Sequence, residues 1–148
     1  MARNVFFSFH YDNDVQRAFV VRQSWVTKPN RTASGVIDRA DFESIKRNGD
    51  AAIKRWIDNQ LIGTSVTVVL IGAETLQRPF VKYEIEQSII RGNGILGVFV
   101  HNIRDFDQTT IPKCDTSGFK FPLYDWINND GYNKLGDWVE AAAIKAGK

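Results

Sequence analysis

Apolar residues occur along the chain in two alternating patterns. Short apolar runs rich in β-branched residues, such as "VTVVLIG" (66–72), predict strands that are buried on both faces. Longer segments with apolar residues three or four positions apart predict helices with one buried face. The main predicted strands cover 4–11, 64–72 and 95–101, and the predicted helices cover 12–26, 49–62, 78–91 and 133–147.

Two weaker patterns predict additional short strands. "GVID" (35–38) is a candidate second strand, and the stretch before it, 27–35, is predicted as a loop from its Pro, Asn, Ser and Gly content. A short edge strand is expected near "KFPLY" (120–124), inside a long irregular stretch at 102–125. Residues 40–48 fit neither pattern.

The alternation of strands and helices predicts right-handed βαβ units and a parallel sheet covered by helices on both faces. About five strands within 148 residues indicate a flavodoxin-like order, 2-1-3-4-5, in a single domain spanning 1–148. In that order a ligand is expected beyond the carboxyl ends of strands 1 and 3. These ends carry "FHYDND" (9–14) and "IGAET" (71–75).

Composition narrows the class of partner. The net charge is only +2 and the basic residues are scattered, so neither nucleic acid nor an anionic membrane is expected as a partner. No apolar run approaches 18 residues and the start of the chain lacks a signal-peptide pattern, so a cytoplasmic protein is expected. Cys114 is the single cysteine, so no intrachain disulfide and no metal motif are expected.

The predicted helix "RPFVKYEIEQSII" (78–90) carries two glutamates that are two positions apart. Glu86 lies one turn after Lys82, a spacing typical of a solvated surface pair. Glu84 shares its flank with Phe80, near the start of a helix that borders the expected crevice. Spacing alone leaves two interpretations of Glu84 open, a solvated surface carboxylate or a carboxylate beside a stacking ligand.

Two other flavodoxin-like functions fit the crevice residues poorly. A flavin mononucleotide site would need a phosphate loop rich in Ser, Thr and Gly after strand 1, whereas "FHYDND" is aromatic and acidic. A phosphate-accepting receiver would need an aspartate at the end of strand 3, and "VVLIGAE" has none.

The chain resembles the TIR-like domains of bacterial Thoeris anti-phage systems. The similarity is carried by "VFFSFHYDND" (5–14), "VVRQSWV" (20–26) and "VTVVLIGAETLQRPFVKYEIEQSI" (66–89). The first segment resembles the opening strand of TIR domains, and the last resembles their strand followed by an aromatic-x-x-x-Glu helix. The resemblance spans most of residues 4–100.

This resemblance implies a flavodoxin-like fold and cleavage of the nicotinamide–ribose bond of NAD, which is the substrate, with no separate cofactor and no metal. It implies a cyclic or conjugated ADP-ribose product that reaches a separate effector as a soluble signal. A phage-derived trigger and self-assembly are further expectations of this resemblance. Many TIR domains are interaction modules without catalysis, and this alternative stays open.

Site residues are carried over position by position. The catalytic glutamate of the family falls on Glu84. The aromatic position four residues earlier, usually Trp in the family, falls on Phe80, which can still stack on substrate with less area. The end of the first strand, which lines the substrate pocket in the family, falls on residues that we expect to contact substrate: Phe7, Ser8, Phe9 and His10. The ring nitrogen of nicotinamide is already positive, so nicotinamide leaves without receiving a proton from an acid. One carboxylate therefore suffices for this chemistry.

Overall fold

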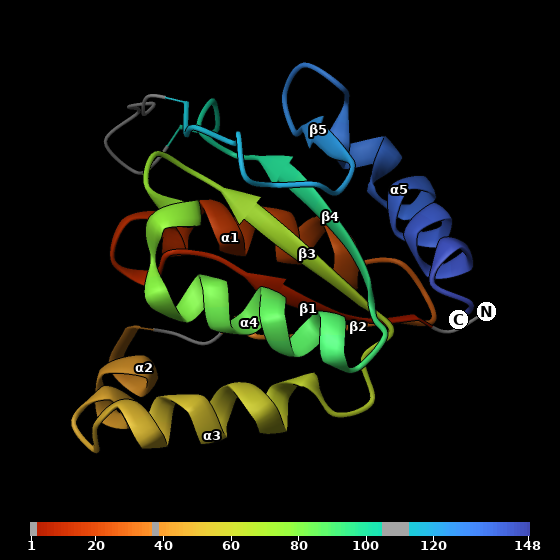
Figure 1. The fold of residues 1–148 in the computed structure, drawn as a ribbon. Coiled ribbons are helices and arrows are strands. Elements are labelled where there is room, and N and C mark those ends of the chain that lie inside the picture. Colours follow the sequence, from red (N-terminus) through yellow and green to blue (C-terminus); the bar gives the residue numbers. More distant parts are fainter. Residues whose placement is uncertain (1–2, 37–38, 105–112) are drawn as a thin grey trace.

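The structure, a computed structural model, describes residues 3–36, 39–104 and 113–148. Strands and helices alternate along the chain (Figure 1). In order, the elements are β1 (Arg3–Ser8), α1 (Tyr11–Val26), β2 (Arg31–Ser34), α2 (Arg39–Lys46), α3 (Asp50–Leu61), β3 (Val66–Ile71), the 3₁₀ turn η1 (Thr75–Gln77), α4 (Pro79–Ile90), β4 (Gly94–Phe99), β5 (Leu123–Asp125) and α5 (Gly131–Lys145). No helix within the described ranges is both long enough and apolar enough to cross a bilayer.

The five strands form one sheet in the order β2-β1-β3-β4-β5, and every neighbouring pair is parallel. This confirms the predicted flavodoxin-like order. Helices α1 and α5 cover one face of the sheet, and α3 and α4 cover the other (Figure 1). The carboxyl ends of the strands therefore meet at one edge, as parallel pairing requires.

The middle of β1 carries apolar side chains on both faces of the sheet. Val5 and Phe7 point into the core beside α1, whereas Phe6 packs on the opposite face with Ile53 and Ile57 of α3. These three side chains are fully buried. Because successive side chains of a strand alternate between faces, a central strand needs apolar residues at nearly every position.

The second strand lies earlier than the sequence pattern predicted. It is Arg31–Ser34, inside the stretch predicted as loop, and not "GVID", of which residues 37–38 lie outside the described part of the chain. This strand is short and polar, and its pairing is made by the backbone, with Arg3 opposite Arg31. Trp25 of α1 also donates its indole N–H to the Thr32 carbonyl at 2.9 Å. Backbone pairing to β1 stabilises a strand that hydrophobic periodicity cannot reveal.

Two other ambiguous stretches take regular structure. The unassigned residues 40–48 contain most of α2, and the expected edge strand near "KFPLY" is β5, shifted to Leu123–Asp125. Helix α2 packs against α3, so it lies on the same side of the sheet as α4 (Figure 1).

The buried face of α4 does not coincide with the apolar stripe formed by Val81, Ile85 and Ile89. Val81 is buried, but Ile89, on the same stripe, is 55% exposed, and the other buried positions are Glu84 and Ser88. The Ser88 hydroxyl lies 2.7 Å from the Thr67 hydroxyl of β3 and donates to the Glu84 carbonyl at 2.7 Å. Polar contacts with the sheet therefore fix which side of this helix faces the sheet.

Candidate active site

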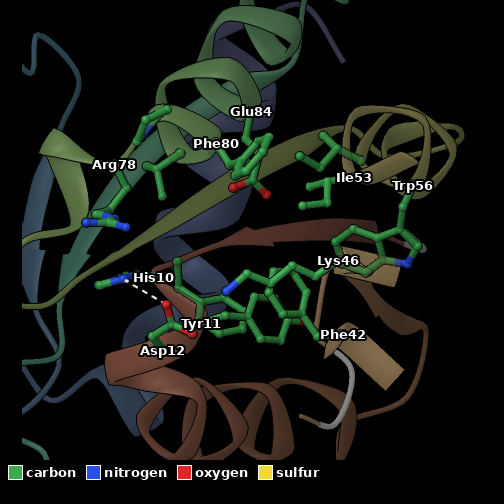
Figure 2. Close-up of a pocket in the computed structure, with 14 residues that line it drawn as sticks. His10, Tyr11, Asp12, Phe42, Lys46, Ile53, Trp56, Arg78, Phe80 and Glu84 are labelled. Atoms are coloured by element: carbon green, nitrogen blue, oxygen red, sulfur yellow. Dashed lines mark ion pairs between the residues drawn. The ribbon is translucent and has the colours of Figure 1, made fainter. Parts of the chain in front are cut away.

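A cavity of about 180 Å³ opens beyond the carboxyl end of β1 (Figure 2). Its walls come from the residues that follow β1, from one side each of α2 and α3, and from the first turns of α4. The lining residues are Phe9, His10, Tyr11, Asp12, Phe42, Lys46, Ile53, Trp56, Ile57, Arg78, Pro79, Phe80, Val81 and Glu84. The predicted crevice is thus correct for strand 1, whereas residues 71–75 after β3 do not line the cavity.

Glu84 reaches this cavity from the buried face of α4 and is only 6% exposed. The Ser8 hydroxyl donates a hydrogen bond to its Oε1 at 3.2 Å. No basic side chain within the described ranges forms an ion pair with it. Burial therefore raises the pKa of Glu84 well above its usual range, and the Ser8 hydrogen bond opposes this only in part. The interpretation of Glu84 as a solvated surface carboxylate is wrong.

Glu86 is solvated, as its spacing predicts, but it forms no ion pair with Lys82 among the described residues. It is exposed and lies, with Lys82, on the flank of α4 that borders a different cavity. Glu84 is buried and Glu86 is exposed, although they lie only two residues apart, because two positions on a helix are separated by about 200° of rotation.

His10 lies at the polar end of the cavity, between Asp12 and Arg78 (Figure 2). The residue is 8% exposed, and neither ring nitrogen has a hydrogen-bond partner among the described residues. Its Nε2 is 3.9 Å from Asp12 Oδ2, which is too long for a hydrogen bond. Burial, followed by the positive charge of Arg78, lowers the pKa of His10, so the neutral imidazole is favoured.

The opposite end of the cavity is aromatic. The rings of Tyr11 and Phe42 stack in parallel, 4.0 Å apart and inclined by 3°. Trp56 stands edge-on to both, with centroid distances of 6.3 Å and 6.4 Å, and the half-buried Phe80 completes the wall from α4. Such flat, rigid surfaces suit an aromatic ligand ring.

The structure brings together most of the residues expected to contact substrate. Phe9, His10, Phe80 and Glu84 line one cavity. Ser8 does not line it but donates a hydrogen bond to Glu84, which does. Phe7 is the exception. Its ring is fully buried on the α1 side of the sheet, because its side chain points to the face opposite that of Ser8.

Several lining residues were not predicted from the sequence as site residues. Phe42 and Lys46 come from α2, which the sequence pattern did not define, and Trp56 occupied an ordinary core position of a predicted helix. Arg78 precedes Pro79 at the start of α4, so the "RP" pair indicates only a helix start. Apart from the one-turn spacing of Phe42 and Lys46, no local signal marks these side chains as neighbours.

Comparison with known proteins identifies the family of this chain. Residues 6–105 match the family described as Thoeris protein ThsB, TIR-like domain. A protein of Bacillus cereus (strain MSX-D12), which carries the provisional name cyclic ADP-D-ribose synthase ThsB1, is 34% identical over a 191-residue alignment. That alignment covers 94% of this chain and 100% of the relative. Together with the parallel sheet in the order 2-1-3-4-5, these matches show that the chain belongs to the TIR-like domain family of Thoeris ThsB proteins.

Proposed function

We propose that this protein is an enzyme of bacterial anti-phage defence that cleaves NAD between nicotinamide and ribose. Its product is a cyclic or conjugated ADP-ribose that signals to a separate effector. The observation that carries the proposal is the buried Glu84 carboxyl, held by Ser8 at the wall of a cavity with aromatic sides. The family membership and the name of the Bacillus cereus relative support the same chemistry.

The substrate supplies the positively charged partner that Glu84 lacks in the protein. The nicotinamide of NAD is a cation, and a cation beside a buried carboxyl favours its ionised form. The C1′–nitrogen bond then breaks, its electron pair moves onto the ring nitrogen, and neutral nicotinamide leaves. The positive charge that develops on the ribose is stabilised by the Glu84 carboxylate. A nucleophile forms the new bond to C1′ and releases its proton.

The size of the cavity limits what it holds. At about 180 Å³ it is smaller than the roughly 300–1,000 Å³ typical of pockets for drug-sized ligands. We assign it to the nicotinamide end of the dinucleotide, with the adenosine outside. The aromatic end with Trp56 suits the nicotinamide ring, and the walls restrict water, which favours attack by a nucleophile of the substrate over hydrolysis.

The alternative is a TIR-type interaction module without catalysis. A surface for protein contact needs no buried carboxyl, and burying one without a basic partner costs stability. Glu84 has this costly arrangement and faces a cavity, which favours the enzyme.

Four other parts of the proposal rest on family membership. They are a single domain spanning 1–148, a cytoplasmic location, a phage-derived trigger, and self-assembly that completes the site.

The test is incubation of the pure protein with NAD, with and without lysate from phage-infected cells, followed by mass spectrometry. The expected result is released nicotinamide together with a product of ADP-ribose mass less one water, or with an ADP-ribose conjugate. Absence of nicotinamide release under both conditions would contradict the proposal.

A further inference from the structure

We infer that Arg78, the first turn of α4 and His10 form a phosphate subsite at the polar end of the cavity. The inference rests on the proposed function, in which Glu84 faces the nicotinamide ribose. It adds the position of the adjoining phosphate and therefore the direction in which the dinucleotide lies in the cavity.

The backbone around Arg78 is fixed before any ligand binds. Its N–H donates to the Thr75 carbonyl at 3.2 Å, and its carbonyl accepts from the Lys82 N–H at 3.1 Å. Pro79 follows at the first helical position, and a residue before proline favours the extended conformation seen here, with φ −78° and ψ 132°. The side chain of Arg78 is exposed, lines the cavity and forms no ion pair or side-chain hydrogen bond with the residues that the structure describes.

The start of α4 adds positive potential at the same place. This end of the helix has no side-chain cap and no acidic residue in its first turn. The N–H groups of Phe80 and Val81 have no carbonyl four residues earlier within the helix, and both residues line the cavity. Unsatisfied N–H groups at a helix start are a common binding site for phosphate.

His10 is the independent sign that a polar ligand group binds here. It is more than nine-tenths buried, both ring nitrogens lack hydrogen-bond partners within the described ranges, and it lines the same cavity as Arg78. A neutral imidazole can donate to a phosphate oxygen through one nitrogen. A bound phosphate would also favour the imidazolium, which would then lie between the phosphate and the Asp12 carboxylate, 3.9 Å from Nε2.

The spacing along α4 agrees with a single bound nucleotide. Glu84 lies six positions after Arg78, which corresponds to about 9 Å along the helix axis. In Figure 2, His10 and Arg78 lie at one end of the cavity and Trp56 at the other, with Glu84 between them. This order matches phosphate, ribose and nicotinamide in sequence.

The first experiment titrates inorganic pyrophosphate into the full chain at constant ionic strength and follows the histidine side chains by NMR. The chain has two histidines, so His101 serves as an internal reference. We expect pyrophosphate to move the His10 resonances and to raise the pKa of His10 while leaving His101 unchanged. The groups that face His10 and affect this titration are Arg78, Asp12 and Glu74.

Charge-matched variants test the assignment to Arg78. R78Q should weaken pyrophosphate binding by roughly tenfold to a hundredfold, the range expected for the loss of a charge-assisted contact. R91Q removes the same charge from the exposed far end of α4 and should bind as wild type does. R78K keeps the charge and should recover part of the affinity. Equal weakening by R78Q and R91Q, or unchanged His10 resonances, would overturn the inference.

Kinetics separate this inference from the proposed function. R78Q should raise the KM for NAD by roughly tenfold or more, but should leave turnover of nicotinamide riboside, which has no phosphate, unchanged. Loss of activity on both substrates alike would overturn the phosphate role. If pyrophosphate shifts the His10 resonances but wild type releases no nicotinamide from NAD, the result supports the phosphate subsite and contradicts the proposed function.

Discussion

Glu84 and Glu86 lie two residues apart on α4, and their surroundings predict opposite responses to the same substitution. Glu84→Gln keeps the size of the side chain and an oxygen that can accept from the Ser8 hydroxyl, but it removes the ability to become an anion. If the carboxylate stabilises the developing positive charge on the ribose, NAD turnover should fall by roughly 100-fold or more. The measurement is nicotinamide release under conditions in which wild type is active.

Glu86→Gln is the matched control, because it makes the same chemical change at an exposed position of the same helix. It should leave turnover near that of wild type and change the free energy of unfolding by less than about 0.5 kcal/mol. Thermal melts establish that both variants are folded. Equal activity of the two variants would contradict the assignment of Glu84.

Asp14 predicts a pH dependence of stability at the residue scale. It is almost fully buried in α1, and burial raises its pKa from 3.8 to about 6, although Arg17 Nη1 lies 3.3 Å from its Oδ1 and opposes the shift. Between these two pKa values the folded state binds more protons than the unfolded state. The free energy of unfolding should therefore decrease as pH rises from about 4 to about 6, by as much as ~3 kcal/mol.

Asp14→Asn isolates this effect, because the amide does not titrate. Urea denaturation of both proteins at several pH values between 4 and 7 should show a decrease in wild type that is smaller in the variant. The variant should lose the ionic contact with Arg17 only above about pH 6, where Asp14 is ionised in folded wild type. Parallel pH profiles for the two proteins would refute the assignment to Asp14.

At the scale of elements, the contact between α5 and β4 depends on one glycine. A Cβ added at Gly94 would collide with the backbone carbonyl of Ala142, which cannot move without shifting the helix. Gly94→Ala should therefore lower the free energy of unfolding by about 1–3 kcal/mol, the usual cost of overpacking. Urea denaturation measures this cost.

Gly118 provides the control for that substitution. It lies in a turn, and an added Cβ would meet no atom within 4 Å. Gly118→Ala should change the free energy of unfolding by no more than about 0.5 kcal/mol. Equal losses in the two variants would show that the close approach of α5 to β4 does not limit stability.

At the scale of the whole molecule, the cavity gathers residues from four separate segments. The loop after β1, α2, α3 and α4 each contribute, and the resulting volume of about 180 Å³ leaves most of a dinucleotide outside. If self-assembly completes the site, as proposed from family membership, activity per molecule should increase with protein concentration.

The measurement is NAD turnover over a wide range of protein concentration, with sedimentation analysis at the same concentrations. Specific activity should rise over the range in which larger species form. Full activity that is independent of concentration, in a species shown to be monomeric, would contradict self-assembly as a requirement.

The sequence alone determined the main strands, most helices and the strand order. β3 and β4 are almost continuous apolar runs, and β1 carries Val5, Phe6 and Phe7 in succession, because helices cover both faces of these strands. Their burial is therefore visible in local composition. The motif around Glu84 and Phe80 also indicated the family, and both residues line the cavity, since they belong to one short helical segment.

The tertiary structure decided which side chains share the site. The buried face of α4 follows its contacts with Ser8 and Thr67 and not its apolar stripe, and no periodicity within the helix reports such partners. Phe42, Trp56 and Arg78 become neighbours of Glu84 only when α2, α3 and α4 pack on the same face of the sheet. Local patterns record how a segment buries its own surface, whereas a cavity depends on how distant segments meet, and that is decided by packing.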